Sequence, residues 1–130
     1  MSGAFSLSLP IPPGINGTGS SRGGYAIATV GGYPRLVLSA RARAWRKDAV
    51  ATVQKYALAA RYTYQGGNLR MVVHRNDRHD VDSGIKLLID SVCSAIGAND
   101  RRLVELVVDR DGDTFDAGFL EVWLEESVNV

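Results

Sequence analysis

The fold is decided by residues 69–108, whose sequence is LRMVVHRNDRHDVDSGIKLLIDSVCSAIGANDRRLVELVV. The stretch opens with an apolar run that predicts a strand over Leu69–His74, at a covered position in a sheet. Apolar residues then recur at three- and four-residue spacing, which predicts a helix over about 84–96 that ends at Gly97. The expected buried stripe of this helix is Ile85, Leu88, Ile89, Val92 and Ile96. A second apolar run predicts a strand over Leu103–Val108.

The flanking sequence adds strands and one more helix. Short β-rich runs predict strands at Ala4–Leu9, Tyr25–Val30, Arg35–Leu38 and Phe119–Leu124. Ser39 is a predicted N-cap for an Ala-rich helix that runs to about Ala60. The residues of this helix expected to face the core are Trp45, Ala49, Val53, Tyr56 and Ala60. The order of elements predicts an α+β fold: one domain over residues 1–130, with two main helices packed on a mixed β-sheet.

The composition and length of the chain exclude several classes of protein. A chain of 130 residues with 45% hydrophobic residues has the size of a single domain. Its apolar runs are far shorter than a bilayer span, and no secretory signal opens it. The single Cys93 excludes an internal disulfide, and its position on an apolar helix face favours core packing over a nucleophilic role. We therefore expect a soluble, cytoplasmic protein with no membrane partner.

The charge is unevenly distributed along the chain. Residues 1–75 carry ten Lys and Arg against one acid, a net charge of +9, whereas residues 76–130 carry five against thirteen, a net charge of −8. Such asymmetry predicts a surface that faces a polyanion beside an acidic region. The alternative is two solvated faces that attract each other in the folded chain.

Four aspartates and a lysine follow the first strand of the deciding stretch. Asp80 and Asp82 are two residues apart, so in an extended backbone their carboxylates lie on one side. Lys86 is four residues after Asp82 and Asp90 is four after Lys86, a spacing of one helical turn. Asp100 follows the helix, where the fold could return it toward the pair.

Converging carboxylates repel one another unless a cation or protons compensate them. Oxygen ligands without His or Cys favour Mg²⁺, with Mn²⁺ as the alternative ion. Such an ion beside Lys86 suits phosphodiester hydrolysis. The competing interpretation is structural: Asp80 and Asp82 cap the helix, and Lys86–Asp90 is an ordinary helical ion pair.

The same residues resemble a known family. Asp80-Val81-Asp82, Lys86, Asp90 and Asp100, with Leu103-Val104 behind them, are similar to the motif of the RusA family of Holliday junction resolvases. The N-terminal segment Leu9-Pro10-x-Pro12-Pro13-x-x-Asn16 is similar to the proline and asparagine segment of that family. The chain departs from the pattern at Ser83, at Asn99 and in the Gly/Ser-rich sequence after Asn16.

The resemblance implies a RusA-like homodimeric endonuclease that cuts four-way DNA junctions symmetrically, in a bacterial or phage-infected cell. It implies that Asp80, Asp82 and Asp100 hold Mg²⁺, that Lys86 is catalytic, and that Asp90 and Asn16 support the site. The expected DNA-binding residues are Arg22, Arg41, Arg43, Arg46, Lys47, Arg75 and Arg78. Two alternatives remain open at this point: a non-catalytic DNA-binding module whose acidic half docks a protein, and a structural or scaffold protein.

Overall fold

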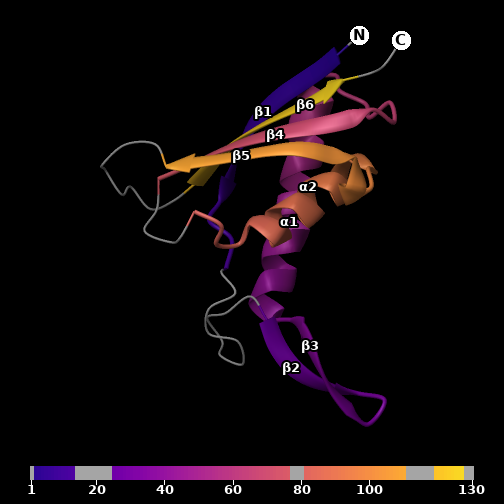
Figure 1. The fold of residues 1–130 in the computed structure, drawn as a ribbon, viewed down its shortest axis with the longest axis vertical. Helices are drawn as coiled ribbons and strands as arrows, with labels where there is room; N and C mark the ends of the chain where they lie inside the picture. The colour runs from indigo at the N-terminus through magenta and orange to yellow at the C-terminus, as the bar shows by residue number, and fades with distance from the viewer. Residues whose placement is uncertain (1, 14–24, 77–80, 111–118, 128–130) are drawn as a thin grey trace.

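A four-stranded mixed sheet lies at one end of the computed structural model, which describes residues 2–13, 25–76, 81–110 and 119–127 (Figure 1). The strands of this sheet are β1 (Ser2–Pro10), β4 (Asn68–Arg75), β5 (Leu103–Arg110) and β6 (Phe119–Ser127). Their order is β1-β6-β4-β5. β6 pairs antiparallel with both β1 and β4, and β4 pairs parallel with β5.

Two helices cover one face of this sheet. α1 (Ala40–Ala59) begins as expected at Ser39, whose Oγ accepts a hydrogen bond from the Ala42 amide at 3.1 Å. α2 (Ile85–Ile96) lies between two glycines in the left-handed conformation, Gly84 before it and Gly97 after it. The interpretation that Asp82 caps α2 is wrong, because Gly84 is the N-cap residue and no side chain makes a capping hydrogen bond there.

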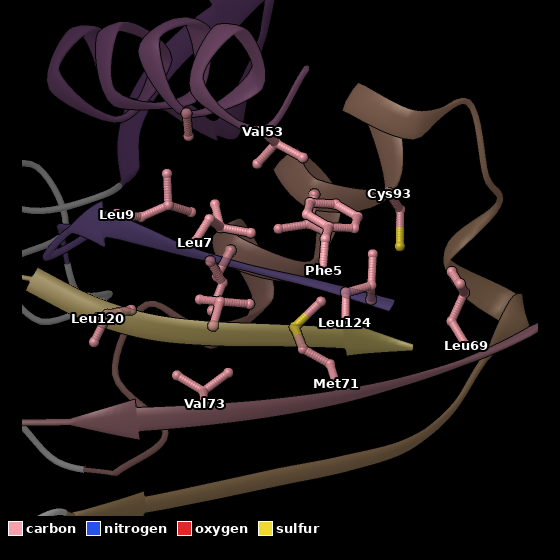
Figure 2. Packing of buried hydrophobic residues seen from close by; sticks show 14 of the residues in the cluster. Phe5, Leu7, Leu9, Val53, Leu69, Met71, Val73, Cys93, Leu120 and Leu124 are labelled. Carbon is pink, nitrogen blue, oxygen red and sulfur yellow. The ribbon is translucent and has the colours of Figure 1, made fainter. Parts of the chain in front are cut away.

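The core lies between the helices and the sheet (Figure 2). Side chains alternate along β4, where Leu69, Met71 and Val73 are fully buried and the residues between them are only half-buried. This alternation is the period of a strand with one face on the core. The other core strands contribute Phe5, Leu7, Leu9, Leu120, Val122 and Leu124.

The buried stripe of α1 differs in part from the expected one. Ala49 and Val53 are buried as predicted, but Tyr56 is 40% exposed and its neighbour Ala57 is buried instead. Trp45 is half-buried, and its indole N–H donates a hydrogen bond to the Pro10 carbonyl at 3.0 Å. This bond joins the first half of α1 to the end of β1.

The remaining strands form a hairpin of their own. β2 (Tyr25–Val30) and β3 (Tyr33–Leu38) pair antiparallel around Gly31 and Gly32, both of which have positive φ. A two-residue turn with positive φ matches the twist of a hairpin, and glycine adopts it without steric cost. β3 begins two residues before the expected Arg35, because Tyr33 and Pro34 already pair with β2. The hairpin lies away from the sheet, below the start of α1 (Figure 1).

The predicted fold class is confirmed: the chain forms a small α+β domain with two helices on a mixed sheet. Within the described ranges, neither helix has the length and apolar character that crossing a bilayer requires.

Candidate functional site

A pocket of about 370 Å³ lies where α1, α2 and the short helix η1 (Asp100–Arg102) meet. Its lining brings together two of the predicted site residues, Asp90 and Asp100, with Arg46, which was expected to contact DNA. The other lining residues are Cys93, Ser94, Ala98 and Asn99.

The chain reversal after α2 positions Asp100. Gly97 turns the backbone with φ +75°, and the Ala98 amide then donates to the Cys93 carbonyl at 2.9 Å. Asn99 caps η1, since its Oδ1 accepts from the Arg101 amide at 3.0 Å. These bonds hold Asp100 beside the last turns of α2, on which Asp90 and Ser94 are one turn apart.

Most residues that line the pocket are polar, and its two aspartates influence the pKa of the Cys93 thiol. Burial raises the pKa of this thiol to about 11, and the charges of Asp100 and Asp90 add to the shift. A thiolate is the reactive form of cysteine, so a thiol with this pKa stays protonated and inert at neutral pH. The core role expected for Cys93 fits its exposed fraction of 2%.

The other members of the aspartate–lysine motif lie outside this pocket. Asp82 is exposed in a turn over residues 81–84, and Lys86 is exposed on the first turn of α2. Asp80 lies outside the described residues. Among the residues that the structure describes, no three His, Cys, Asp or Glu side chains form a group that could hold a metal ion.

The turn over residues 81–84 is held by Arg75. This arginine, expected on a DNA-binding surface, is fully buried at the end of β4. Its Nη1 donates hydrogen bonds to the carbonyls of Val81 at 2.9 Å and Ser83 at 2.6 Å. The guanidinium therefore fixes the chain that leads into α2.

The remaining basic residues are placed as follows. Arg41, Arg43 and Lys47 are exposed on α1, as expected, while Arg46 is half-buried at the pocket. Asn16, Arg22 and Arg78 lie outside the described residues. The site residues that sequence reasoning missed are Ser94 and Asn99. The four-residue spacing from Asp90 to Ser94 was a usable signal, because both lie on one side of a helix.

No protein-family model and no curated protein matches the chain. Two solved structures are similar to it over 96% of its length. One is 2C-methyl-D-erythritol 2,4-cyclodiphosphate synthase from Plasmodium vivax, with 13% identity, a TM-score of 0.42 and 94% of that chain covered. The other is IspF from Plasmodium falciparum in complex with CDP, with 9% identity, a TM-score of 0.44 and 92% of that chain covered. Both are enzymes, and the likeness is too distant to carry an activity to this chain.

These comparisons overturn the resemblance to the RusA family. Neither family models nor curated proteins support it, and the two similar structures are synthases rather than junction resolvases. The predicted Holliday junction resolvase, its branched DNA substrate and its RusA-like homodimer are therefore wrong.

Proposed function

We propose that the chain is a metal-dependent enzyme whose pocket at Asp90 and Asp100 binds a divalent cation and a phosphate group of a small-molecule substrate. One observation carries this proposal: two aspartates from different elements, Asp90 and Asp100, line one open pocket together with Arg46. Carboxylates attract the cation, and a guanidinium matches the geometry of phosphate oxygens.

The ligands available in the pocket fit a Mg²⁺ or Mn²⁺ ion shared with a substrate better than a metal ion in a closed structural site. A closed structural site needs a group of three or four ligands, which the described residues do not form. Mg²⁺ is instead bound by one or two carboxylates together with substrate phosphates, and it keeps several waters. Asp90 and Asp100 supply two hard oxygen ligands, so substrate phosphate completes the site.

Each residue of the pocket has a separate proposed role. Asp90 and Asp100 hold the cation, which when bound polarises the phosphate and offsets its charge. Arg46 binds the phosphate from the α1 side and stabilises charge that develops there. Cys93 stays neutral beneath them. Lys86, one helical turn before Asp90, is proposed to orient that carboxylate. A volume of about 370 Å³ suits a small phosphorylated molecule.

Cation binding tests the first half of the proposal. Mn²⁺ is titrated into the protein with and without inorganic pyrophosphate and followed by electron paramagnetic resonance. We expect pyrophosphate to tighten Mn²⁺ binding, Asp100→Asn and Asp90→Asn to weaken it about tenfold, and Arg46→Gln to abolish the pyrophosphate effect alone. Asp48→Asn, an exposed aspartate on α1, is the matched control.

Catalysis tests the second half. The protein is incubated with Mn²⁺ and a panel of small phosphate monoesters and diphosphates, and phosphorus-containing products are followed by ³¹P NMR. Turnover that disappears in Asp100→Asn but persists in Asp48→Asn is the expected result. Mn²⁺ binding that is unchanged in both pocket variants would refute the site, and binding without any turnover would refute the enzyme.

A further inference from the structure

The face of the sheet opposite the helices carries ordered rows of side chains. Residues that pair across strands stand side by side on one face. The middle row runs from Ser6 to three apolar residues, Trp123, Val72 and Val107. In the described part of the chain both helices pack on the other face, and Val107 is 41% exposed.

An acidic row lies on each side of the apolar row. The first joins Glu121, His74 and Asp109, in which His74 Nδ1 lies 2.5 Å from Asp109 Oδ1. Ser8 extends this row, since its hydroxyl donates to Glu121 at 2.6 Å. Side-chain exposures of 44% for His74 and 49% for Asp109 keep the row open to a partner.

The second acidic row joins Glu125, Arg70 and Glu105. Arg70 donates to both carboxylate oxygens of Glu105, at 2.7 and 3.1 Å. The pKa of Arg70 is raised by this bond first, and the charge of Glu125 adds to the effect. The guanidinium therefore lies between two carboxylates.

The balance of charge on this face selects the chemistry of its occupant. Four carboxylates face one guanidinium and one imidazole, so the face is acidic on both sides of an apolar centre. A membrane of anionic lipids or a nucleic acid is repelled by such a surface. A cationic segment is attracted, and large apolar side chains such as Trp123 are the usual anchors of interfaces.

We propose that this open face is a docking surface for a basic segment of a partner protein, whose cationic side chains lie against the acidic rows and whose apolar side chain packs on Trp123. Along β6 this face presents Glu121, Trp123 and Glu125 at every second residue. An extended segment lying over this strand would place its own alternate residues against them, so a basic–apolar–basic order on one face of the segment fits.

The test uses two synthetic peptides. One has the sequence Lys-Thr-Phe-Thr-Lys, in which Lys, Phe and Lys share one face of an extended chain, and the other has Glu in place of both Lys; both carry a fluorescent label and are followed by fluorescence polarisation. The basic peptide is expected to bind and to weaken with added salt, and the acidic peptide is expected not to bind. Absence of binding by the basic peptide, or equal binding of both, would overturn the proposal.

Variants locate the binding. Glu121→Gln and Glu125→Gln keep the side-chain shape and are each expected to weaken the basic peptide about threefold, and Trp123→Thr about tenfold. Asp48→Asn on α1 removes the same charge elsewhere and is expected to leave binding unchanged. An equal loss in Asp48→Asn would mean unspecific attraction. Sedimentation showing a dimer that Glu121→Gln dissociates would identify a second copy as the occupant, and either result would overturn the proposal.

Discussion

The carboxylate of Glu126 on β6 accepts a hydrogen bond at 2.7 Å from the hydroxyl of Tyr62, which lies in the connection between α1 and β4. Glu126 lies near the end of β6 with only 1% of its surface exposed. It also accepts from the backbone amides of Gln65 at 3.0 Å and Gly67 at 2.7 Å. One buried acid thus fastens a whole connecting segment to the sheet.

We expect Glu126→Gln to lower the free energy of unfolding by roughly 1–3 kcal/mol, because the amide group of glutamine would face amide donors that the carboxylate satisfies. Urea unfolding followed by circular dichroism measures this loss. Glu125→Gln, the next residue on the opposite face, is the matched control and should change stability by no more than about 0.5 kcal/mol. A loss for Glu126→Gln no larger than that of the control would contradict the role of Glu126.

Glu126 also makes stability depend on pH. Burial alone would raise the pKa of Glu126, but hydrogen bonds from Tyr62, Gln65 and Gly67 outweigh it and hold the pKa below its usual value. Because the folded state has the lower pKa, this stabilisation is present above the unfolded pKa of glutamate and is lost as the pH falls through the folded pKa. The thermal midpoint of the native chain should therefore fall more steeply in acid than that of Glu126→Gln. If the thermal midpoints of the native chain and of Glu126→Gln fall equally with pH, Glu126 is not the source of the pH dependence.

Gly84 determines how α2 begins. Its φ is +73°, and a Cβ there would lie 2.6 Å from Cγ of the buried Pro12. Gly84→Ala should therefore cost about 1–2 kcal/mol of backbone strain and a further 1–3 kcal/mol of crowding. Gly97 has a similar φ of +75° but open space around its Cβ position, so Gly97→Ala should cost the strain alone. If urea unfolding shows equal losses of stability for Gly84→Ala and Gly97→Ala, Pro12 moves aside without cost and the predicted crowding is wrong.

The helices and strands were predictable because local spacing of apolar residues indicates each of them. The strand at Leu69–His74 and the helix at Ile85–Ile96 follow from apolar spacing and flanking glycines. The sheet order β1-β6-β4-β5 was not predictable, since pairing between β1 and β6 joins the two ends of the chain. No local pattern encodes such distant partners.

The site was predictable only in part. The four-residue step from Asp82 to Lys86 supposed a helix, but α2 begins at Ile85 and Asp82 lies in the preceding turn. Asp90 and Asp100 do line one pocket, because Gly97 reverses the chain between them. Arg75 and Glu126 were missed as structural residues because charged side chains are normally exposed, and only tertiary partners reveal a buried one.

Arg75 is expected to stabilise the turn before α2 in a way that lysine cannot replace. Its Nη1 donates hydrogen bonds to the carbonyl oxygens of Val81 and Ser83. Removing the guanidinium takes this donor away from both oxygens. Arg75→Met should therefore cost roughly 2–4 kcal/mol, and Arg75→Lys should recover little, because an ammonium is more strongly hydrated than a guanidinium and is harder to bury. Hydrogen exchange should show the amide of Ile85, which donates to the Asp82 carbonyl, losing protection first. Unchanged protection there would refute this role.

Cys93 reports on the carboxylates of the pocket. Burial, Asp100 and Asp90 together raise the pKa of its thiol to about 11, so the folded protein should react with iodoacetamide only at high pH, with a midpoint near that value. Removing a nearby negative charge favours the thiolate, so Asp100→Asn and Asp90→Asn should each move the midpoint to lower pH. The pH profile distinguishes this effect from simple opening of the pocket, which would raise the rate at every pH. Asp48→Asn, which lies outside the pocket, should leave the midpoint in place. Fast alkylation of the folded chain at neutral pH, or a midpoint that both pocket variants leave unmoved, would contradict the arrangement of Cys93 beneath Asp90 and Asp100.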